Sequence, residues 1–194
     1  SSLWMYGDPE NYDLKIEIAK KHNVKPENII IGEGIDGLLG YLVRMFVEPK
    51  DKVVTTDGSY PTFNYHVNGY GGLLKKIPFK NDFENLDSLL KISKIEFPKI
   101  VYVSNPNNPM GTLNKKVEMK KFITEVPKET LICLDEAYAD FVSTDELIDI
   151  DINQENIIRM RTFSKAYGLA GARVGYGIGH KKLINNFDKI RNHF

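Results

Sequence analysis

Short, continuous apolar runs constrain the fold of this chain more than any other feature. The runs cover residues 29–31, 53–54, 100–103, 131–134, 157–158 and 174–178. Apolar residues that follow one another without alternation are typical of strands buried on both faces of a sheet. Between the runs, residues 14–22, 35–47, 115–125 and 181–191 carry apolar residues at a spacing of three to four, which predicts helices.

Strands that alternate with helices predict an α/β fold, with a mainly parallel sheet covered by helices on both faces. The chain has 194 residues, and domains commonly have roughly 100–200 residues. No low-complexity tract or long linker interrupts the pattern. We therefore expect one domain over residues 1–194.

Charge and cysteine content exclude several classes of protein. The 26 basic residues balance 26 acidic residues, which argues against a nucleic-acid or membrane-surface partner. No apolar stretch approaches the roughly 20 residues of a transmembrane helix, and the first residues do not resemble a signal peptide. The single cysteine, Cys133, lies in an apolar run, so a disulfide scaffold and a cysteine-pair zinc site are excluded. The four histidines lack a metal-like spacing, and we expect no metal site and a cytoplasmic location.

A glycine-rich turn follows the first apolar run. Gly32, Gly34 and Gly37 form a G-x-G-x-x-G pattern between a predicted strand and a predicted helix, and Asp57 follows 20 residues later. This pattern fits a nicotinamide dinucleotide site in an oxidoreductase. It also fits a more general phosphate site, because the backbone N–H groups of Gly34 and Ile35 would lie at the positive end of a helix dipole. A tight turn without a ligand is the third interpretation.

Two ionisable residues follow later apolar runs. Asp135 ends a run of four apolar residues, where a carboxylate is costly to bury unless a cation, such as a protonated ring nitrogen, lies against it. A helix N-cap is the alternative role. Lys165 lies among small residues and precedes Arg173 by eight positions. A deprotonated lysine forms Schiff bases with carbonyl groups, and an arginine can bind a phosphate dianion.

The sequence around Lys165 resembles a known signature. Residues 162–173 read T-F-S-K-A-Y-G-L-A-G-A-R, which is similar to the lysine segment of fold-type I pyridoxal-phosphate (PLP) aminotransferases of classes I and II, and most similar to the histidinol-phosphate aminotransferase group. The S-N-P-N-N-P-M-G of residues 104–111 resembles the N-P-x-G turn of that family. The L-D-E-A-Y of residues 134–138 resembles its D-x-A-Y strand end. The motifs agree in order and spacing over nearly the whole chain.

The resemblance implies a role for each matched residue around the cofactor ring. Lys165 would form a Schiff base with PLP and then move a proton at the substrate Cα. Asp135 would pair with the pyridinium nitrogen and keep the ring an electron sink. Tyr60 would stack on the ring, and Asn108 and Tyr138 would donate hydrogen bonds to its phenolic oxygen.

The resemblance also implies a phosphate clamp and a homodimer. The phosphate would lie against the backbone of the glycine turn and the side chains after the lysine strand, a set that comprises Gly34, Ile35, Thr162, Ser164 and Arg173. Tyr6 matches a tyrosine that reaches the phosphate of the neighbouring subunit. A homodimer with sites at its interface is therefore implied.

Two departures from the family pattern affect what we expect of the chain. Met110 stands where the family usually has threonine. The family's smaller C-terminal domain, which normally supplies the arginine for the substrate carboxylate, is not represented, and Arg173 matches the phosphate ligand instead. The chain begins without methionine and ends within a predicted helix. We therefore expect residues 1–194 to be a PLP-binding large domain from a longer protein, which binds cofactor but does not turn over substrate alone.

The expected reaction is transfer of an amino group between an amino acid or a histidinol-phosphate-like amine and a 2-oxo acid. Three alternatives remain open at this point. A decarboxylase of a phosphorylated amino acid belongs to the same family. A nicotinamide-dependent oxidoreductase would use Gly32, Gly34 and Gly37. A non-catalytic PLP-binding domain of a transcription regulator would use the same fold for sensing.

Overall fold

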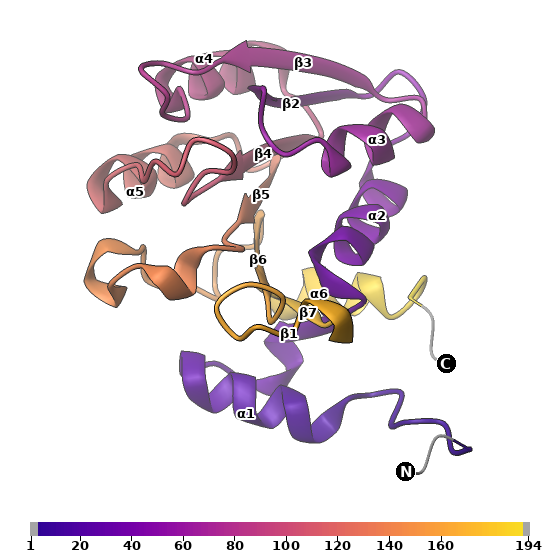
Figure 1. Ribbon diagram of the computed structural model, residues 1–194. Helices are drawn as coiled ribbons and strands as arrows, with labels where there is room; N and C mark the ends of the chain where they lie inside the picture. Colours follow the sequence, from indigo (N-terminus) through magenta and orange to yellow (C-terminus); the bar gives the residue numbers. More distant parts are fainter. Residues whose placement is uncertain (1–3, 192–194) are drawn as a thin grey trace.

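The computed structural model describes residues 4–191, which form a seven-stranded sheet between two layers of helices (Figure 1). The strands are β1 (Ile29–Gly32), β2 (Lys52–Asp57), β3 (Leu73–Pro78), β4 (Ile100–Ser104), β5 (Leu131–Asp135), β6 (Ile157–Thr162) and β7 (Gly175–Gly179). Their order across the sheet is β1-β7-β6-β5-β4-β2-β3. The α/β prediction of a mainly parallel sheet with helices on both faces is confirmed.

All neighbouring pairs from β6 to β3 are parallel, and β7 is antiparallel to both β1 and β6. The carboxyl ends of β2, β4, β5 and β6 therefore meet at one edge of the sheet. In the register of β4 and β5, Ser104 pairs with Asp135 at that edge. The last residue of each central strand thus faces the same space.

Six α-helices cover the sheet in this part of the chain. They are α1 (Tyr12–His22), α2 (Gly34–Phe46), α3 (Thr62–Gly69), α4 (Leu86–Glu96), α5 (Lys116–Glu125) and α6 (Lys181–Phe187). Short 3-10 turns occupy η1 (Pro26–Asn28), η2 (Ala139–Phe141), η3 (Thr144–Glu146) and η4 (Ala170–Ala172). None of the helices within residues 4–191 has both the length and the apolar character needed to cross a membrane.

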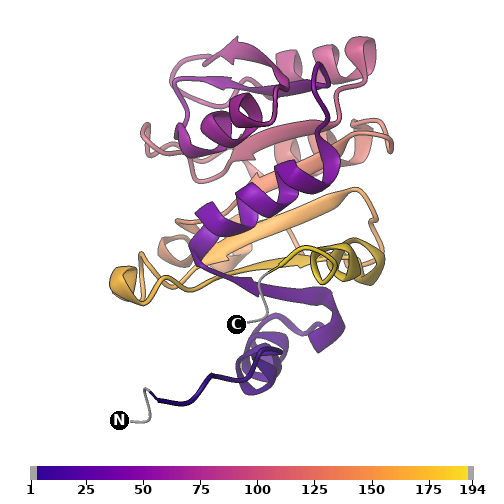
Figure 2. The same cartoon turned by 90° about the vertical axis from the view of Figure 1, so that its right-hand side faces the viewer.

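The two faces of the sheet have separate cores. On one face, α2, α3 and α6 bury a cluster that includes Leu38, Leu42, Phe63 and Phe187, and Figure 2 shows α2 lying across this face. On the other face, α4 and α5 bury a second cluster, while α1 packs on β1 and β7 at the edge of the sheet. Each helix is amphipathic because one stripe meets the sheet and the other meets solvent.

The end of the described chain departs from the predicted helix over residues 181–191. Helix α6 ends at Phe187, and the chain then turns so that Arg191 reaches the N-terminal segment. The Arg191 guanidinium donates to the carbonyl of Pro9 at 2.6 Å and to Glu10 at 2.7 Å, and it also pairs with Asp188. The helix stops early because this ion-paired arginine packs against the other end of the chain.

Candidate functional site

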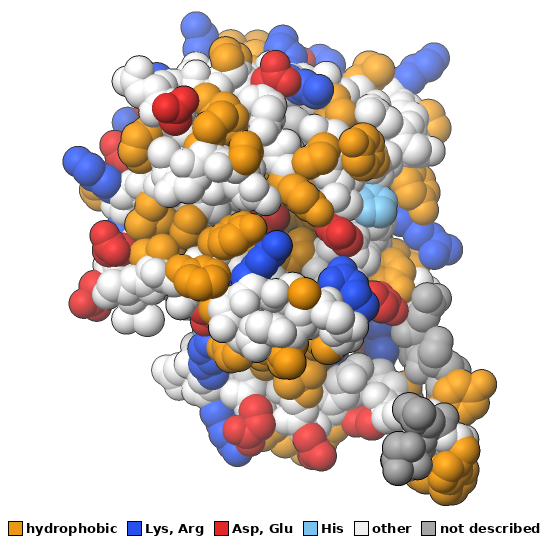
Figure 3. Space-filling model, in the orientation of Figure 1, with side chains coloured by type: hydrophobic (Ala, Val, Ile, Leu, Met, Phe, Trp, Pro, Cys, Tyr) orange, Lys and Arg blue, Asp and Glu red, His pale blue; other side chains and the backbone are white. Residues whose placement is uncertain are grey.

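A pocket opens at the carboxyl edge of the sheet, where the loops after β2, β4, β5 and β6 meet the first turn of α2. Its lining combines two acids, a lysine and an arginine with aromatic and small polar residues, namely Ile35, Asp36, Tyr60, Ser104, Asn108, Asp135, Ala137, Tyr138, Thr162, Ser164, Lys165 and Arg173. Figure 3 shows basic and acidic side chains around a hollow in the middle of this face. The four sequence motifs thus converge on one site.

Asp135 forms the buried floor of the pocket, with only 6% of its surface exposed. Its Oδ2 accepts a hydrogen bond from the Tyr102 hydroxyl at 2.6 Å, and its Oδ1 accepts one from the Ala137 N–H at 2.9 Å. Burial raises the pKa of Asp135, and the hydrogen bond from Tyr102 opposes that effect. Both donors are neutral, so the carboxylate is held in place while its charge stays available to a cation in the pocket.

The loop after β6 presents Lys165 to the pocket. Thr162 anchors the loop, because its hydroxyl accepts from the Ser164 N–H at 3.1 Å and donates to the Val174 carbonyl at 3.3 Å. The Gly168 N–H donates to the Lys165 carbonyl, which closes a tight turn. The Lys165 Nζ lies 5.3 Å from the centre of the Tyr138 ring. The amine therefore lies over an aromatic face and within reach of the pocket.

Gly34 and Arg173 make a close contact at the start of α2. Gly34 has a φ of 74°, and a Cβ built on it would lie 2.6 Å from Arg173 Nη2. Gly175 is equally constrained, because its Cβ would lie 2.6 Å from the Gly34 carbonyl carbon. Only glycine lets the guanidinium and β7 approach the helix N-terminus this closely. A guanidinium beside free backbone N–H groups is a suitable place for an anion.

The remaining predicted residues divide into two groups. Tyr60 follows β2 and Asn108 follows β4, and both line the pocket with Ile35. Tyr6 does not line it. Its largely exposed side chain borders a separate groove on the other side of Arg173. The sequence did not single out Asp36, Ser104 or Ala137 as lining residues, although each lies beside a predicted residue in a motif, and that adjacency was the available signal.

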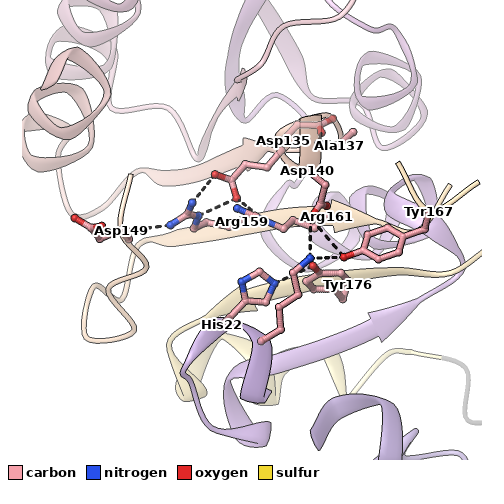
Figure 4. A network of polar contacts seen from close by, with 11 residues as sticks. His22, Asp135, Ala137, Asp140, Asp149, Arg159, Arg161, Tyr167 and Tyr176 are labelled. Carbon is pink, nitrogen blue, oxygen red and sulfur yellow. Dashed lines mark hydrogen bonds and ion pairs between the residues drawn. The ribbon is translucent and has the colours of Figure 1, made fainter. Parts of the chain in front are cut away.

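Behind the pocket, a buried network around Arg159 and Arg161 joins β5 to β6 (Figure 4). The Glu136 carboxylate, which follows Asp135, accepts from Arg159 Nη2 at 2.5 Å and from Arg161 Nε at 3.0 Å. Arg159 also donates to the Asp149 carbonyl at 3.0 Å. Burial acts to raise the pKa of Glu136, but the two guanidinium groups outweigh it and hold that pKa below its usual value. The network fixes the strand end that carries Asp135.

A lysine from α1 connects the loops that follow β5 and β6. Lys21 Nζ donates to Asp140 at 2.7 Å and to the Tyr167 hydroxyl. Asp140 lies two residues after Tyr138, and Tyr167 lies two residues after Lys165. The ammonium group therefore ties together the two segments that bring Tyr138 and Lys165 to the pocket.

Comparison with known families agrees with this geometry. The family model for aminotransferases of class I and II matches residues 1–194. The chain belongs to this family. It is 35% identical, over 99% of its length, to the histidinol-phosphate aminotransferase of Moorella thermoacetica, and it covers 50% of that relative. Over the full length of this chain it is 36% identical to the histidinol-phosphate aminotransferase of Anaeromyxobacter sp., and it covers 54% of that relative.

Solved structures also resemble the chain. The crystal structure of histidinol-phosphate aminotransferase from Sinorhizobium meliloti, in complex with pyridoxal-5'-phosphate, aligns with a TM-score of 0.95 and 48% identity over 99% of this chain and 53% of that one. The L-threonine-O-3-phosphate decarboxylase of Porphyromonas gingivalis shares the fold, with a TM-score of 0.78 and 20% identity. The chain spans about half the length of the curated relatives it matches.

The oxidoreductase interpretation of Gly32, Gly34 and Gly37 is wrong for this aminotransferase-family chain. In a dinucleotide site the acidic residue ends the strand beside the glycine turn. Here the glycine turn follows β1, at one edge of the sheet, and Asp57 ends β2, with β7, β6, β5 and β4 lying between them. The carboxylate of Asp57 forms an ion pair with Lys76 instead.

Proposed function

We propose that residues 1–194 form the PLP-binding large domain of a histidinol-phosphate-type aminotransferase. Its reaction is transfer of an amino group between an amino acid or histidinol-phosphate-like amine and a 2-oxo acid. The observation that carries this proposal is a single pocket lined by Asp135, Lys165 and Arg173. These are an acid for a ring nitrogen, an amine for an aldehyde and a guanidinium for a phosphate.

The chemistry of the donor set fits PLP. The cofactor is dianionic at its phosphate, and Arg173, Ser164 and the backbone N–H of Ile35 offer donors at one part of the pocket. The backbone N–H of Gly34 lies beside Arg173, and Thr162 holds the loop that carries Ser164. Its ring nitrogen is basic, and Asp135 is a buried carboxylate whose partners are neutral donors. Because Gly34 has no Cβ, the Arg173 guanidinium can lie close to the start of α2, where the phosphate would bind.

Each residue then has a defined task. Bound PLP supplies an electron sink for negative charge that develops at the substrate Cα. Asp135 holds a proton on the ring nitrogen, because its buried charge is stabilised by that cation. Lys165 attaches the cofactor through its Nζ and moves the proton at the substrate Cα. Tyr60 covers the ring face, and Asn108 and Tyr138 orient the ring through its phenolic oxygen.

A homodimer is part of this proposal. Tyr6 is exposed and lies on a groove that Arg173 also borders, so a tyrosine from a second copy can approach the phosphate ligands from that side. Small-molecule amino and oxo acids are the expected partners, and a cytoplasmic location is expected from the sequence. The relatives of similar sequence favour transamination over decarboxylation of a phosphorylated amino acid.

The first experiment tests cofactor attachment. Wild-type chain treated with PLP and then with borohydride should carry one PLP on the peptide that contains Lys165. Lys165→Ala should carry none, whereas Lys182→Ala, which removes an exposed lysine paired with Glu155, should behave as wild type. Labelling of wild type at other lysines only, or unchanged labelling of Lys165→Ala, would contradict the proposal.

The second experiment separates the two family reactions. The chain loaded with PLP is mixed with candidate amines, and pyridoxamine phosphate and carbon dioxide are measured. Formation of pyridoxamine phosphate supports transamination, and release of carbon dioxide supports the decarboxylase alternative. Wild-type chain that attaches PLP but yields neither product would agree with the expectation that these residues alone bind cofactor without turnover.

A further inference from the structure

Glu84 is a buried carboxylate that belongs to none of the sequence motifs. It lies in the segment between β3 and α4 and is 2% exposed. Its Oε2 accepts a hydrogen bond from the Thr56 hydroxyl, and its Oε1 accepts from the Ser59 hydroxyl at 3.4 Å, the Ser104 N–H at 3.2 Å and the Asn107 Nδ2 at 2.8 Å. One side chain thus gathers donors from two segments of the chain, residues 56–59 and residues 104–107.

The donors to Glu84 flank the residues of the pocket. Ser59 immediately precedes Tyr60, and Asn107 immediately precedes Asn108. Ser104 ends β4 and itself lines the pocket. The carboxylate therefore holds the two loops that bring an aromatic ring and an amide to the site, and it does so from outside the pocket.

A second set of contacts fixes Glu84 from the opposite side. The Asn114 Nδ2 donates to the Glu84 carbonyl at 3.1 Å, and the Asn114 N–H donates to Asn105 Oδ1 at 2.8 Å. Glu84 is thus attached through both its backbone and its side chain to the loop between β4 and α5. Contacts within the chain therefore fix the position of its carboxylate.

The four hydrogen bonds to the Glu84 side chain require a carboxylate. All four groups that contact the Glu84 oxygens are donors, and an ionised carboxylate offers acceptor sites only. Burial raises the pKa of Glu84, and the hydrogen bonds from Thr56, Ser104, Asn107 and Ser59 oppose that effect. A glutamine of the same shape would turn an NH2 group toward at least one donor, which would leave a buried donor without an acceptor.

We propose that Glu84 is a positioning residue of this site, which sets the places of Tyr60 and Asn108 by holding the loops on which they lie. The proposal rests on the proposed function, because Tyr60 and Asn108 are assigned there to the PLP ring. Its effect on the cofactor is transmitted through Ser59, Ser104 and Asn107 rather than by direct contact.

The test compares Glu84→Gln with Glu96→Gln. Glu84 lies two residues before α4, whereas Glu96 is the last residue of α4 and pairs with Lys52 and Lys75. Hydrogen exchange of the PLP-free chains is measured first. Glu84→Gln should exchange faster than wild type in residues 57–61 and 104–111 only, and Glu96→Gln should match wild type there. Equal exchange of Glu84→Gln and wild type in both segments would overturn the proposal, whether or not the wild-type chain binds PLP.

The second readout is the visible absorption band of bound PLP. Glu84→Gln should bind PLP about tenfold more weakly, the change that about 1.4 kcal/mol produces. The pH midpoint of the band should shift in the same direction as in Asn108→Ala, because both variants disturb the group placed at the phenolic oxygen. A role in stability alone would lower the unfolding midpoint and leave affinity and band midpoint at wild-type values, which would overturn the proposal.

Two controls keep the outcomes separate. If wild-type chain forms no visible band with PLP, the proposed function fails, and the exchange measurement alone decides whether Glu84 holds the loops. If Glu84→Gln does not fold, Asn107→Ala removes the shortest of the donors to Oε1 and keeps the carboxylate. It should then show the same faster exchange and shifted midpoint, and wild-type behaviour would count against the proposal.

Discussion

The Tyr102 hydroxyl donates a hydrogen bond of 2.6 Å to Asp135 Oδ2 from the neighbouring strand. Tyr102 is fully buried in β4, and its ring stacks on Phe63 with centroids 4.6 Å apart. Burial raises the pKa of Tyr102 well above its usual value, so the group stays a neutral donor. The pair orients the carboxylate without neutralising it, and the chain without cofactor carries a buried acid.

Asp135→Asn should weaken PLP binding and make the stability of the PLP-free chain less dependent on pH. Because burial raises the pKa of Asp135 above its usual 3.8, the native chain binds this proton more tightly than the unfolded chain. Asp135 therefore contributes its full stability below pH 3.8, the usual pKa of the unfolded chain, and this contribution is lost as the pH rises through the pKa of the folded chain. Asparagine does not titrate, but its Nδ2 would face one of the two donors, Tyr102 or Ala137. We therefore expect a stability that varies less with pH than that of wild type, together with a PLP affinity at least about tenfold lower.

Urea unfolding at pH 7 and pH 5, with and without PLP, measures both effects of Asp135→Asn. The stability of the variant relative to wild type should be higher at pH 7 than at pH 5, and PLP should stabilise the variant less than it stabilises wild type. The same stability difference from wild type at both pH values would show that the buried charge is already compensated within the chain.

Glu136→Gln should be strongly destabilising. The Glu136 carboxylate is shared by Arg159 and Arg161, which are themselves buried. Removing one partner of a buried ion pair leaves uncompensated charge, which typically costs about 3–5 kcal/mol. Urea unfolding checks this value, and Glu125→Gln, which affects an exposed pair with Lys94, should change little. A small loss for Glu136→Gln would mean that water solvates the two guanidinium groups.

His22 should make the chain acid-sensitive. Its ring nitrogen lies 2.9 Å from the Tyr176 hydroxyl, and burial, followed by the charge of Arg161, lowers its pKa from 6.5 to about 4. The unfolded chain therefore takes up this proton before the native chain does, and stability is lost as the pH falls from 6.5 toward 4. His22→Gln should lose less stability than wild type between pH 7 and pH 5 in urea unfolding, and identical losses would contradict the assignment.

The apolar strands of the sheet were predictable from the sequence, and the polar edge strand β3 was not. Continuous apolar runs identified the strands of the sheet centre because both faces of those strands are covered. The edge strand β3 carries the exposed Lys75 and Lys76, so it lacked that pattern. Helix α4 was not among the predicted helices. For α3 the sequence indicated only that Pro61 suits a first helical turn, because α3 contains asparagine and glycine and depends on burying Phe63 and Val67.

The motif residues of the pocket were predictable, and the residues that support them were not. Lys165, Asp135 and Asn108 lie in local patterns, and parallel strands bring their ends to one edge. Tyr102 was read as part of an apolar run, since its hydroxyl finds Asp135 only across the strand pair. Glu84 gains its importance from four donors at least 20 positions away in sequence, and no local pattern reports such contacts.

Gly34→Ala should weaken binding of PLP but not of pyridoxal, which lacks the phosphate. At a φ of 74°, an added Cβ would lie 2.6 Å from Arg173 Nη2 and would displace the guanidinium from the start of α2. The left-handed backbone also costs alanine about 1–2 kcal/mol.

Gly71→Ala is the matched control, because Gly71 has a φ of 75° and its Cβ would meet only ordinary contacts with Pro49. We expect similar losses of stability in urea, with an affinity for PLP about tenfold lower in Gly34→Ala alone. Equal weakening of PLP and pyridoxal, or none for either, would mean that Arg173 does not bind the phosphate.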